Sequence, residues 1–422
     1  MKKIAVILSA GFLSFVACGA TEAQGVSLST DPTTRRVTVS YSLAAPAIVT
    51  AEFLTNGVPI GMEKSWAMAG DVNKYVTNSA CSFAWQPRAE DGGFEAAAGD
   101  LSVRITTWTL SEPPPYMVVM LNVFSNRFYY TSEKALPGGI GDARYRGDNL
   151  LMRFIPAAGA TFLMGSPSSE AGRNPRTDWG DEARHYVSFS NNFYIGVFEL
   201  TQWQMASIMP SLVSTYSGYA DSRFRPAETF SGEQVFRGWR NNGYRWPQDD
   251  HKVASNTAFD VLRKRTGLLF DFPTEAQWEF AARAGSETQL PKGLSMGNVS
   301  NSYCANTDRF GWVTFNSAVD GVFQSHPVGL KEENGWGLYD VIGNVGEICL
   351  DTYDKDNPFD LVTAPDVDPP GYETTDRITM VVRGGEFENY LQNDRLATRG
   401  MQSYSSSSRL SGVRLWCLPP EE

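Results

Sequence analysis

The hydrophobic pattern changes along this chain of 422 residues, and the change limits the fold more than any single motif does. Over residues 25–121 apolar and polar residues alternate, as in Val37, Val39 and Tyr41 with polar neighbours between them. Alternation with period two is typical of strands that bury one face. Short strands at this spacing predict an antiparallel sandwich of the immunoglobulin or fibronectin type over residues 25–128.

The rest of the chain follows a different pattern. Residues 129–148, which contain Leu136-Pro137-Gly138-Gly139, predict a linker. Residues 149–419 are rich in glycine, tryptophan and asparagine and hold few long periodic segments, which favours an irregular α+β domain. The clearest helix begins at the capping box of Thr274 and Gln277 and ends at about Gly285.

The first residues predict export. A short basic start is followed by an apolar run over residues 4–17 that is too short to span a bilayer. We therefore expect a secretory signal peptide over residues 1–23 and a periplasmic or extracellular protein. Alternatively, Cys18 becomes a lipid anchor after cleavage of a lipoprotein signal. No later segment of the sequence is long and apolar enough to span a membrane.

The net charge and the cysteine and histidine content argue against some classes of ligand. The net charge of −11 argues against nucleic acid, because nucleic-acid binding needs basic patches. The three histidines lie far apart and no C-x-x-C occurs, so a structural zinc site is not expected. One disulfide or several buried thiols are expected instead among the remaining cysteines, which are Cys81, Cys304, Cys349 and Cys417.

Several motifs occur in a fixed order over residues 149–417. They read FLMGSPSSEAGRN, VSFSNNFYIGVFELTQWQ, FPTEAQWEFAARAG, ENGWGLYDVIGNVGEI, RGGEFENYLQNDRLATR and SSSSRLSGVRL. In this order they resemble the formylglycine-generating enzyme, or sulfatase-modifying factor, family. The resemblance implies an irregular α+β fold related to C-type lectins, with little regular secondary structure.

The resemblance also implies calcium. Calcium takes six to eight oxygen ligands from carboxylates, amides and main-chain carbonyls. By resemblance, one site uses the side chains of Asp340 and Glu347 and the carbonyls of Gly343 and Val345. A second site is expected at Asn306, the Thr307 carbonyl, Asp320 and the Val322 carbonyl. The alternative is that the acids only cap turns.

Copper is not expected. Family enzymes that oxidise a substrate cysteine bind copper through two cysteines in the segment after the R-G-G motif. Here that segment, residues 386–394, contains no cysteine, and Cu(I) requires soft thiolate ligands. Glu386 stands where the family usually has serine, and Gly346 stands where it has tryptophan. The sequence therefore gives no confident catalytic residue.

Three functions remain open. In the first, the chain is a binding or accessory module for an unknown protein or glycan ligand. Its carboxy-terminal segment has the tyrosine, serine and asparagine composition of adaptable binding loops. The candidate ligand-binding residues are Tyr390, Asn393, Asp394 and Tyr404. A solvated surface loop is the plain alternative.

The other two functions are enzymatic. Glu386 and Glu388 could form an acid/base pair if the site desolvates one of them, which would suit a divergent oxidoreductase of the superfamily. Relatives in the superfamily also use iron, but three scattered histidines do not favour that metal. Sulfatase maturation by formylglycine formation is the third function, and the missing cysteines argue against it.

The arginines and glycines of the same segment have a separate expected role. We expect Arg383, Arg395 and Arg399 to hold loops together through carboxylates and carbonyls, as partly buried guanidinium groups do. Gly384 and Gly385 would let the chain pass close beneath them. Residues 386–394 would then line a surface concavity.

Overall fold

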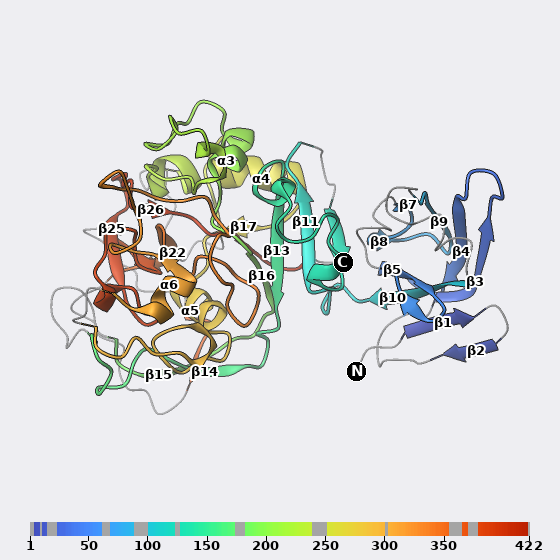
Figure 1. The fold of residues 1–422 in the computed structure, drawn as a ribbon, viewed down its shortest axis with the longest axis horizontal. Helices are drawn as coiled ribbons and strands as arrows, with labels where there is room; N and C mark the ends of the chain where they lie inside the picture. The colour runs from blue at the N-terminus through green and yellow to red at the C-terminus, as the bar shows by residue number, and fades with distance from the viewer. Residues whose placement is uncertain are drawn as a thin grey trace. The chain divides into compact units, whose positions relative to one another are not determined.

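The computed structural model describes residues 4–8, 11–14, 23–60, 68–87, 100–122, 127–173, 182–238, 251–299, 303–353, 365–369 and 379–420. The chain divides into two compact units (Figure 1). The first comprises Met1–Val119, Arg127–Tyr145 and Pro419–Glu422, and the second comprises Met120–Asn126 and Arg146–Leu418.

The first unit contains two antiparallel sheets. One has the order β2-β1-β10-β5-β6, with β8 also paired to β5. The other has the order β3-β4-β9-β7. The strands of the first sheet are β1 (Ile4–Leu8), β2 (Gly11–Ser14), β5 (Ala47–Thr55), β6 (Val58–Pro59), β8 (Lys74–Val76) and β10 (Leu101–Trp108). Those of the second are β3 (Ala23–Thr30), β4 (Val37–Leu43), β7 (Met68–Gly70) and β9 (Ala80–Trp85).

One core joins the two sheets of the first unit. The alternation in β4 turns Val37, Val39 and Tyr41 inward, as the sequence predicts. Phe53 on β5 stacks on Trp85 on β9, with ring centroids 4.5 Å apart, so side chains of the two sheets meet. The sheets therefore form a two-layered β structure, and its immunoglobulin or fibronectin type stays a prediction.

The predicted signal peptide overlaps β1 and β2. The main chain of β1 pairs with β10, from Ile4 opposite Thr106 to Ile7 opposite Val103. Cys18 and the expected cleavage site lie outside the described residues. This pairing tests neither cleavage nor export, and both stay predictions.

The predicted linker, residues 129–148, is folded where the structure describes it. Strands β11 (Tyr116–Met120) and β12 (Arg127–Tyr130) pair antiparallel, and the turns η1 (Glu133–Ala135) and η2 (Ala143–Arg146) follow. Tyr129 and Tyr145 are buried, and the Tyr145 hydroxyl donates to the Pro137 carbonyl at 2.8 Å. The segment differs from an exposed connector because its aromatic side chains bury apolar surface.

The second unit is rich in short strands. One sheet runs β13-β16-β27-β17, another β14-β15-β23, and a third β25-β24-β22-β26. Their strands are β13 (Asn149–Ile155), β14 (Thr161–Met164), β15 (His185–Ser188), β16 (Phe193–Gly196), β17 (Phe270–Asp271), β22 (Gly346–Thr352), β23 (Asp366–Val367), β24 (Thr379–Arg383), β25 (Gly400–Ser403), β26 (Ser411–Gly412) and β27 (Trp416–Cys417). Two short pairs are β18 (Gly311–Trp312) with β21 (Ile342–Gly343) and β19 (Ala318–Val319) with β20 (Val322–Phe323).

Helices in the second unit are short. They are α3 (Gln202–Ile208), η3 (Ser222–Phe224), η4 (Gly232–Arg237), α4 (Ala258–Thr266), α5 (Glu275–Arg283), η6 (Pro291–Gly293), α6 (Ala305–Phe310) and η7 (Leu391–Asn393). None of the helices in the described part of the chain has the length and apolar character needed to cross a membrane. Few helices and many short strands agree with the irregular α+β architecture expected for this part of the chain.

Helix α5 begins as the sequence predicts and positions the site. The Thr274 hydroxyl accepts from the Gln277 main-chain N–H, and the Gln277 side chain accepts from the Thr274 N–H. Trp278, Ala281 and Ala282 are buried in the core of the unit. α5 packs against β22 and β24 (Figure 1), so its polar side chains reach the segment that follows β24.

Candidate functional site

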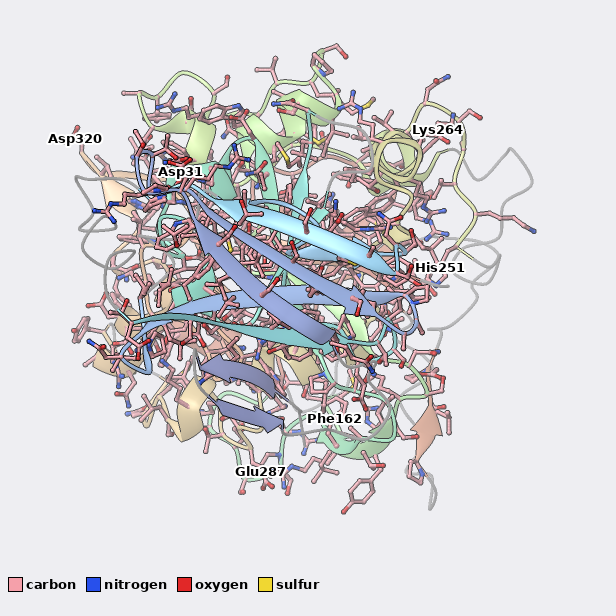
Figure 2. The ribbon with its side chains drawn as sticks, turned by 90° about the vertical axis from the view of Figure 1, so that its right-hand side faces the viewer. Asp31, Phe162, His251, Lys264, Glu287 and Asp320 are labelled. Carbon is pink, nitrogen blue, oxygen red and sulfur yellow. The ribbon has the colours of Figure 1, made fainter. Side chains whose placement is uncertain are left out.

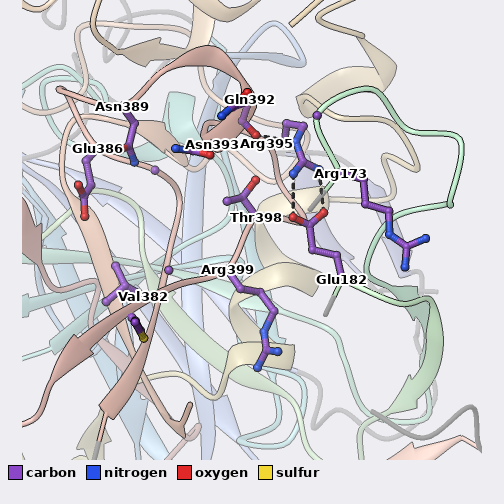
Figure 3. A pocket seen from close by; sticks show the side chains of 14 residues that line it. Arg173, Glu182, Val382, Glu386, Asn389, Gln392, Asn393, Arg395, Thr398 and Arg399 are labelled. Atoms are coloured by element: carbon purple, nitrogen blue, oxygen red, sulfur yellow. Dashed lines mark hydrogen bonds and ion pairs between the residues drawn. The ribbon is translucent and has the colours of Figure 1, made fainter. Parts of the chain in front are cut away.

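A cavity of about 630 Å³ opens at the segment between β24 and β25 (Figure 3). Most of its wall comes from the carboxy-terminal segment after the R-G-G motif, and the rest comes from a loop after β14. Its lining residues are Gly172, Arg173, Glu182, Val382, Gly385, Glu386, Asn389, Gln392, Asn393, Arg395, Thr398, Arg399, Gly400 and Met401. No cysteine is among these described residues. We refer to this cavity as the pocket.

Arg395 joins the two parts of the pocket wall. Its guanidinium donates to both carboxylate oxygens of Glu182, at 2.7 and 2.8 Å (Figure 3). It also donates to Glu170 at 2.7 Å and to the Gln392 carbonyl at 2.8 Å. Arg395 is buried. A two-pronged guanidinium–carboxylate pair fixes orientation as well as distance, so Arg395 ties the carboxy-terminal segment to the loop after β14.

Arg383 and Arg399 bind the same segment to α5. Arg399 pairs with both oxygens of Glu275, at 2.6 and 2.8 Å. Arg383 donates to the carbonyls of Ala397 and Thr398 and to the carboxylate of Glu279. Both guanidinium groups are buried and paired with acids of α5, and Nε of Arg383 has no hydrogen-bond partner in the described structure. This is the arrangement that the expected scaffold role requires.

Gly384 and Gly385 turn the chain into the pocket. Their φ angles of +93° and +81° lie in the left-handed region that residues with side chains rarely adopt. A Cβ on Gly385 would stand 2.2 Å from Oδ1 of Asp394. Glycine is therefore required at this position by both backbone conformation and space.

Glu386 lines the pocket, and its carboxylate has no ion pair or hydrogen bond among the described residues. Burial and the neighbouring Glu388 raise the pKa of Glu386 to about 7, and Arg409 opposes the rise. Glu388 itself forms an ion pair with Arg409 at 2.6 Å. The two acids expected as an acid/base pair thus have different surroundings, and only Glu386 faces the pocket.

The expected ligand-binding residues separate into accessible and buried ones. Asn393 lines the pocket, and Tyr390 is 72% exposed. Tyr404, in contrast, is only 5% exposed, and its hydroxyl donates to the Gly238 carbonyl at 3.1 Å. Tyr404 therefore does not line a surface concavity, because its ring packs inside the unit.

Asp394 is also buried, contrary to the expectation that it faces a ligand. It is 0% exposed, and neither carboxylate oxygen has a partner of normal hydrogen-bond geometry among the described residues. Burial raises the pKa of Asp394 well above its usual value, against the opposing effect of the Glu386 main-chain N–H. Asp394 lies beneath Gly385 instead of in the pocket wall.

Sequence reasoning missed the part of the pocket that comes from the loop after β14. Gly172, Arg173 and Glu182 lie about 200 positions before the carboxy-terminal segment. No local pattern marks them, because their role depends on the pairing of Glu182 with Arg395. The expectation that Arg395 binds a carboxylate predicted a partner for it, but no sequence feature located that partner at Glu182.

The first expected calcium site lies in a cluster of buried acids. Glu347 pairs with Arg414 and accepts from the Trp278 indole N–H at 2.5 Å. Asp340 accepts from the Gly329 N–H at 2.6 Å through one oxygen, and its other oxygen is buried without a partner. Burial raises the pKa of Asp340 to about 6. The buried, unpartnered oxygen of Asp340 is compatible with a bound cation.

The ligand set at this site would depend on main-chain carbonyls. In the described part of the chain, no group of three or more histidine, cysteine, aspartate or glutamate side chains is placed to hold a metal. The resemblance implies the carbonyls of Gly343 and Val345 as the additional ligands. The Val345 N–H donates to the buried carboxylate of Glu199 at 3.1 Å. Calcium here stays a prediction.

The second expected calcium site is more open. The Asn306 side chain donates to the Ser295 carbonyl at 2.8 Å. Asp320 and Val322 lie at the exposed turn between β19 and β20, and Asp320 is visible at the surface in Figure 2. Thr307 is buried on α6. No hydrogen bond joins these residues, and the site also stays a prediction.

All four cysteines in the described part of the chain are buried, and none is in a disulfide; they are Cys81, Cys304, Cys349 and Cys417. Of the two expected alternatives, the structure thus shows buried thiols and not a disulfide. Burial raises the pKa of Cys349 well above its usual value. A thiol of this kind is protonated and poorly reactive at neutral pH.

Comparison with known proteins gives the family. A model of the sulfatase-modifying factor enzyme 1-like domain matches residues 149–417. A formylglycine-generating enzyme of Thermomonospora curvata is 35% identical over 170 residues, which cover 39% of this chain and 55% of that protein. The chain thus spans about half the length of that relative.

One further sequence relative, whose name calls it inactive, and one solved structure are also similar to this chain. The inactive C-alpha-formylglycine-generating enzyme 2 of Mus musculus is 37% identical over 82 residues, or 19% of this chain and 26% of that protein. Among solved structures, Treponema denticola variable protein 1 is similar at 22% identity and a TM-score of 0.45, covering 64% of this chain and 96% of that one. The family model covers well over half of the chain, and the protein therefore belongs to the sulfatase-modifying factor enzyme 1-like family.

Proposed function

We propose that this protein is an exported binding or accessory module of the family that uses the pocket to hold a ligand and does not oxidise cysteine. The proposal combines a predicted signal peptide over residues 1–23, or a lipid anchor at Cys18, with a carboxy-terminal segment that builds a cavity. Export is inferred from the sequence pattern of residues 1–23. Mass spectrometry of the mature protein tests it by locating the amino terminus.

One observation carries the proposal. The pocket is lined by amides, acids and paired arginines, and no thiol is among its described lining residues. Copper(I) binding needs soft sulfur ligands, which carboxylates and amides do not replace. The buried thiol of Cys349 is held by burial in its protonated form and lies outside the pocket lining. These features support ligand binding, and not copper chemistry, as the use of the pocket.

Calcium has a structural role in this proposal. Asp340 and Glu347, with the carbonyls of Gly343 and Val345, would hold one cation, and Asn306, Thr307, Asp320 and Val322 a second. A bound cation would supply positive charge to the cluster of buried acids around Asp340. It takes no part in the pocket, because none of these residues lines it.

The alternative function is enzymatic, and the relatives favour it. Several curated relatives bear the name formylglycine-generating enzyme. In this alternative the chain acts on sulfatases as an oxidase, or Glu386 takes part in a different oxidation as a proton acceptor. The inactive mouse relative shows that the family also contains a protein named as lacking the activity.

A direct assay separates the two functions. Purified full-length protein is incubated with copper, oxygen and a sulfatase-type cysteine peptide, and the peptide mass is measured. We expect no change in the thiol above a no-enzyme control, with a formylglycine-generating enzyme of Thermomonospora curvata as the positive control. Conversion of cysteine to formylglycine by this protein would disprove the proposal.

A further inference from the structure

Two cationic side chains of the pocket wall, Arg395 and Arg399, are already paired with carboxylates inside the protein. Arg395 has two carboxylates, Glu182 and Glu170, within ion-pair distance. Arg399 is bound by Glu275. Figure 3 shows Arg173 on the opposite side of the pocket from Glu386. None of these arginines forms an ion pair with Glu386 in the described structure.

Glu386 is the acid of the pocket that has no ion pair with any described residue. Arg409, which lowers its pKa, is bound to Glu388 at 2.6 Å and to the Tyr216 hydroxyl at 2.7 Å. Beneath the pocket, the carboxyl oxygens of Asp394 have no hydrogen-bond partner among the described residues, and burial raises its pKa, which favours the neutral acid. A buried carboxylate without a positive partner is costly, so this region would gain from an added cation.

The position of Glu386 depends on a glycine in a neighbouring strand. A Cβ on Gly346, at the start of β22, would stand 2.5 Å from Cγ1 of Val382 and 3.4 Å from Oε1 of Glu386. Any larger side chain at position 346 would occupy the volume that Val382 and Glu386 now fill. Glycine at 346 and glutamate at 386 therefore act together to place a carboxyl group in the pocket wall.

We propose that the pocket takes the cationic end of a lysine or arginine side chain from a partner protein, with Glu386 as its counter-ion. This inference rests on the proposed binding function and names its ligand chemistry. The amide oxygens of Asn389 and Asn393, which line the same pocket as Glu386 (Figure 3), can accept further N–H groups of the ligand. The exposed ring of Tyr390, next in sequence to Asn389, offers a face for cation–π contact.

An anionic or neutral ligand fits this charge pattern less well. An anion would meet the carboxyl group of Glu386, while the guanidinium groups of Arg395 and Arg399 are held by acids of the protein. A neutral sugar would leave the ionised form of Glu386 without a positive partner. Only a cation lowers the electrostatic cost of this wall.

Binding of a cation is expected to depend on pH. The ligand favours the ionised form of Glu386, whose pKa in the free protein is about 7. The ionised fraction therefore rises from roughly one-tenth at pH 6 to roughly nine-tenths at pH 8, which predicts about tenfold tighter binding at pH 8. Glu388, Arg409, Asp394 and Arg395 are the other charged groups around Glu386, and ionisation of Asp394 would act in the same direction.

The test uses the full-length protein and small probes. Nα-acetyl-lysine amide and Nα-acetyl-arginine amide are titrated by calorimetry at pH 6 and pH 8. Nα-acetyl-citrulline amide serves as the neutral match for the arginine probe, and Nα-acetyl-glutamate amide as the anion. We expect the cationic probes to bind about tenfold more tightly at pH 8, and the neutral and anionic probes to bind at least about tenfold more weakly than the cations.

Variants connect the binding to Glu386. Glu386→Gln keeps the shape of the side chain and is expected to remove both the binding and its pH dependence, and Glu386→Ser is a second variant in case the first does not fold. Glu332→Gln is the matched control, because Glu332 pairs with Arg309 outside the pocket. It is expected to bind as the parent protein does.

The outcomes distinguish this inference from the proposed function. Equal binding of the citrulline probe, unchanged binding by Glu386→Gln, or no binding of any cationic probe would overturn the inference. If the neutral or anionic probe binds instead and Asn393→Ala removes that binding, the pocket is a ligand site and only its assigned chemistry is wrong. Failure of the proposed function itself appears as cysteine oxidation in the peptide assay.

Discussion

At the scale of single residues, the three arginines of the carboxy-terminal segment decide its shape. Each is buried, and each donates to oxygens that lie far away in the sequence, such as Glu182 for Arg395 and Glu275 for Arg399. A guanidinium group offers five N–H donors in a fixed plane, so one residue can fix several loops at once. Tyr390 is the contrasting case, because it is exposed and no hydrogen bond holds its hydroxyl among the described residues.

Arg395→Ala is expected to destabilise the protein strongly. The change leaves the buried carboxylates of Glu182 and Glu170 without their cation, and breaking a buried pair costs about 3–5 kcal/mol. Tyr390→Ala, as the matched surface change, is expected to alter the free energy of unfolding by less than about 0.5 kcal/mol. Urea unfolding of the two variants measures both values. A stable Arg395→Ala variant beside an unfolded Tyr390→Ala variant would show that the tyrosine belongs to the core.

At the scale of elements, the pocket is built where β22 and β24 lie side by side. The two strands pair antiparallel, with Glu347 opposite Arg383 and Ile348 opposite Val382. Gly346 stands at the start of β22 and is the position where the side chains of Val382 and Glu386 come close to a neighbouring main chain. The distance of 2.5 Å between Val382 Cγ1 and a Cβ at position 346 is shorter than real contacts allow. The sheet therefore sets which side chains fit at the pocket wall.

Gly346→Ala is expected to cost about 1–3 kcal/mol, because the added methyl group overpacks the wall. Val382→Ala removes the methyl group that the new Cβ at position 346 would meet. The double variant Gly346→Ala/Val382→Ala is therefore expected to lose less stability than the sum of the single changes. A double-mutant cycle by urea unfolding measures this coupling, expected at about 0.5–3 kcal/mol. Additive effects would mean that another contact limits position 346.

At the scale of the whole second unit, buried charge is unevenly distributed. Arg383, Arg395 and Arg399 each pair closely with an acid, whereas Glu199, Asp340 and Glu347 share one guanidinium, that of Arg414. Burial and then the charges of Asp340 and Glu347 raise the pKa of Glu199 well above its usual value. The acids of this cluster exceed its cations, which is the situation that calcium binding would relieve.

Calcium is expected to raise the melting temperature of the protein. Binding to the folded state alone stabilises by about 2.7 kcal/mol when the free ion is 100-fold above its dissociation constant. For a unit of this size that corresponds to a shift on the order of 5 °C. Melts in calcium and in chelator measure the shift, and Asp340→Ala is expected to reduce it. Identical melts, together with no calcium by elemental analysis of the purified protein, would rule the site out.

Local features of the sequence determined several elements. Thr274 and Gln277 lie three residues apart and bind each other's main chain, so the start of α5 needs no distant partner. The alternation of Val37, Val39 and Tyr41 placed one face of β4 in a core. The order of motifs gave the family, and the absence of cysteine from residues 386–394 is a matter of sequence alone.

Only the tertiary structure decided which side chains of the carboxy-terminal segment face the pocket. Asp394 and Tyr404 were expected to bind a ligand but are buried, whereas Glu386 faces the cavity. The reason is that the direction and burial of a side chain depend on contacts between distant parts of the chain. Here these contacts are Gly385 above Asp394 and Glu182 beside Arg395. The pKa of Glu386 depends on burial in the same way, so the chemistry of the pocket follows from packing that no local pattern encodes.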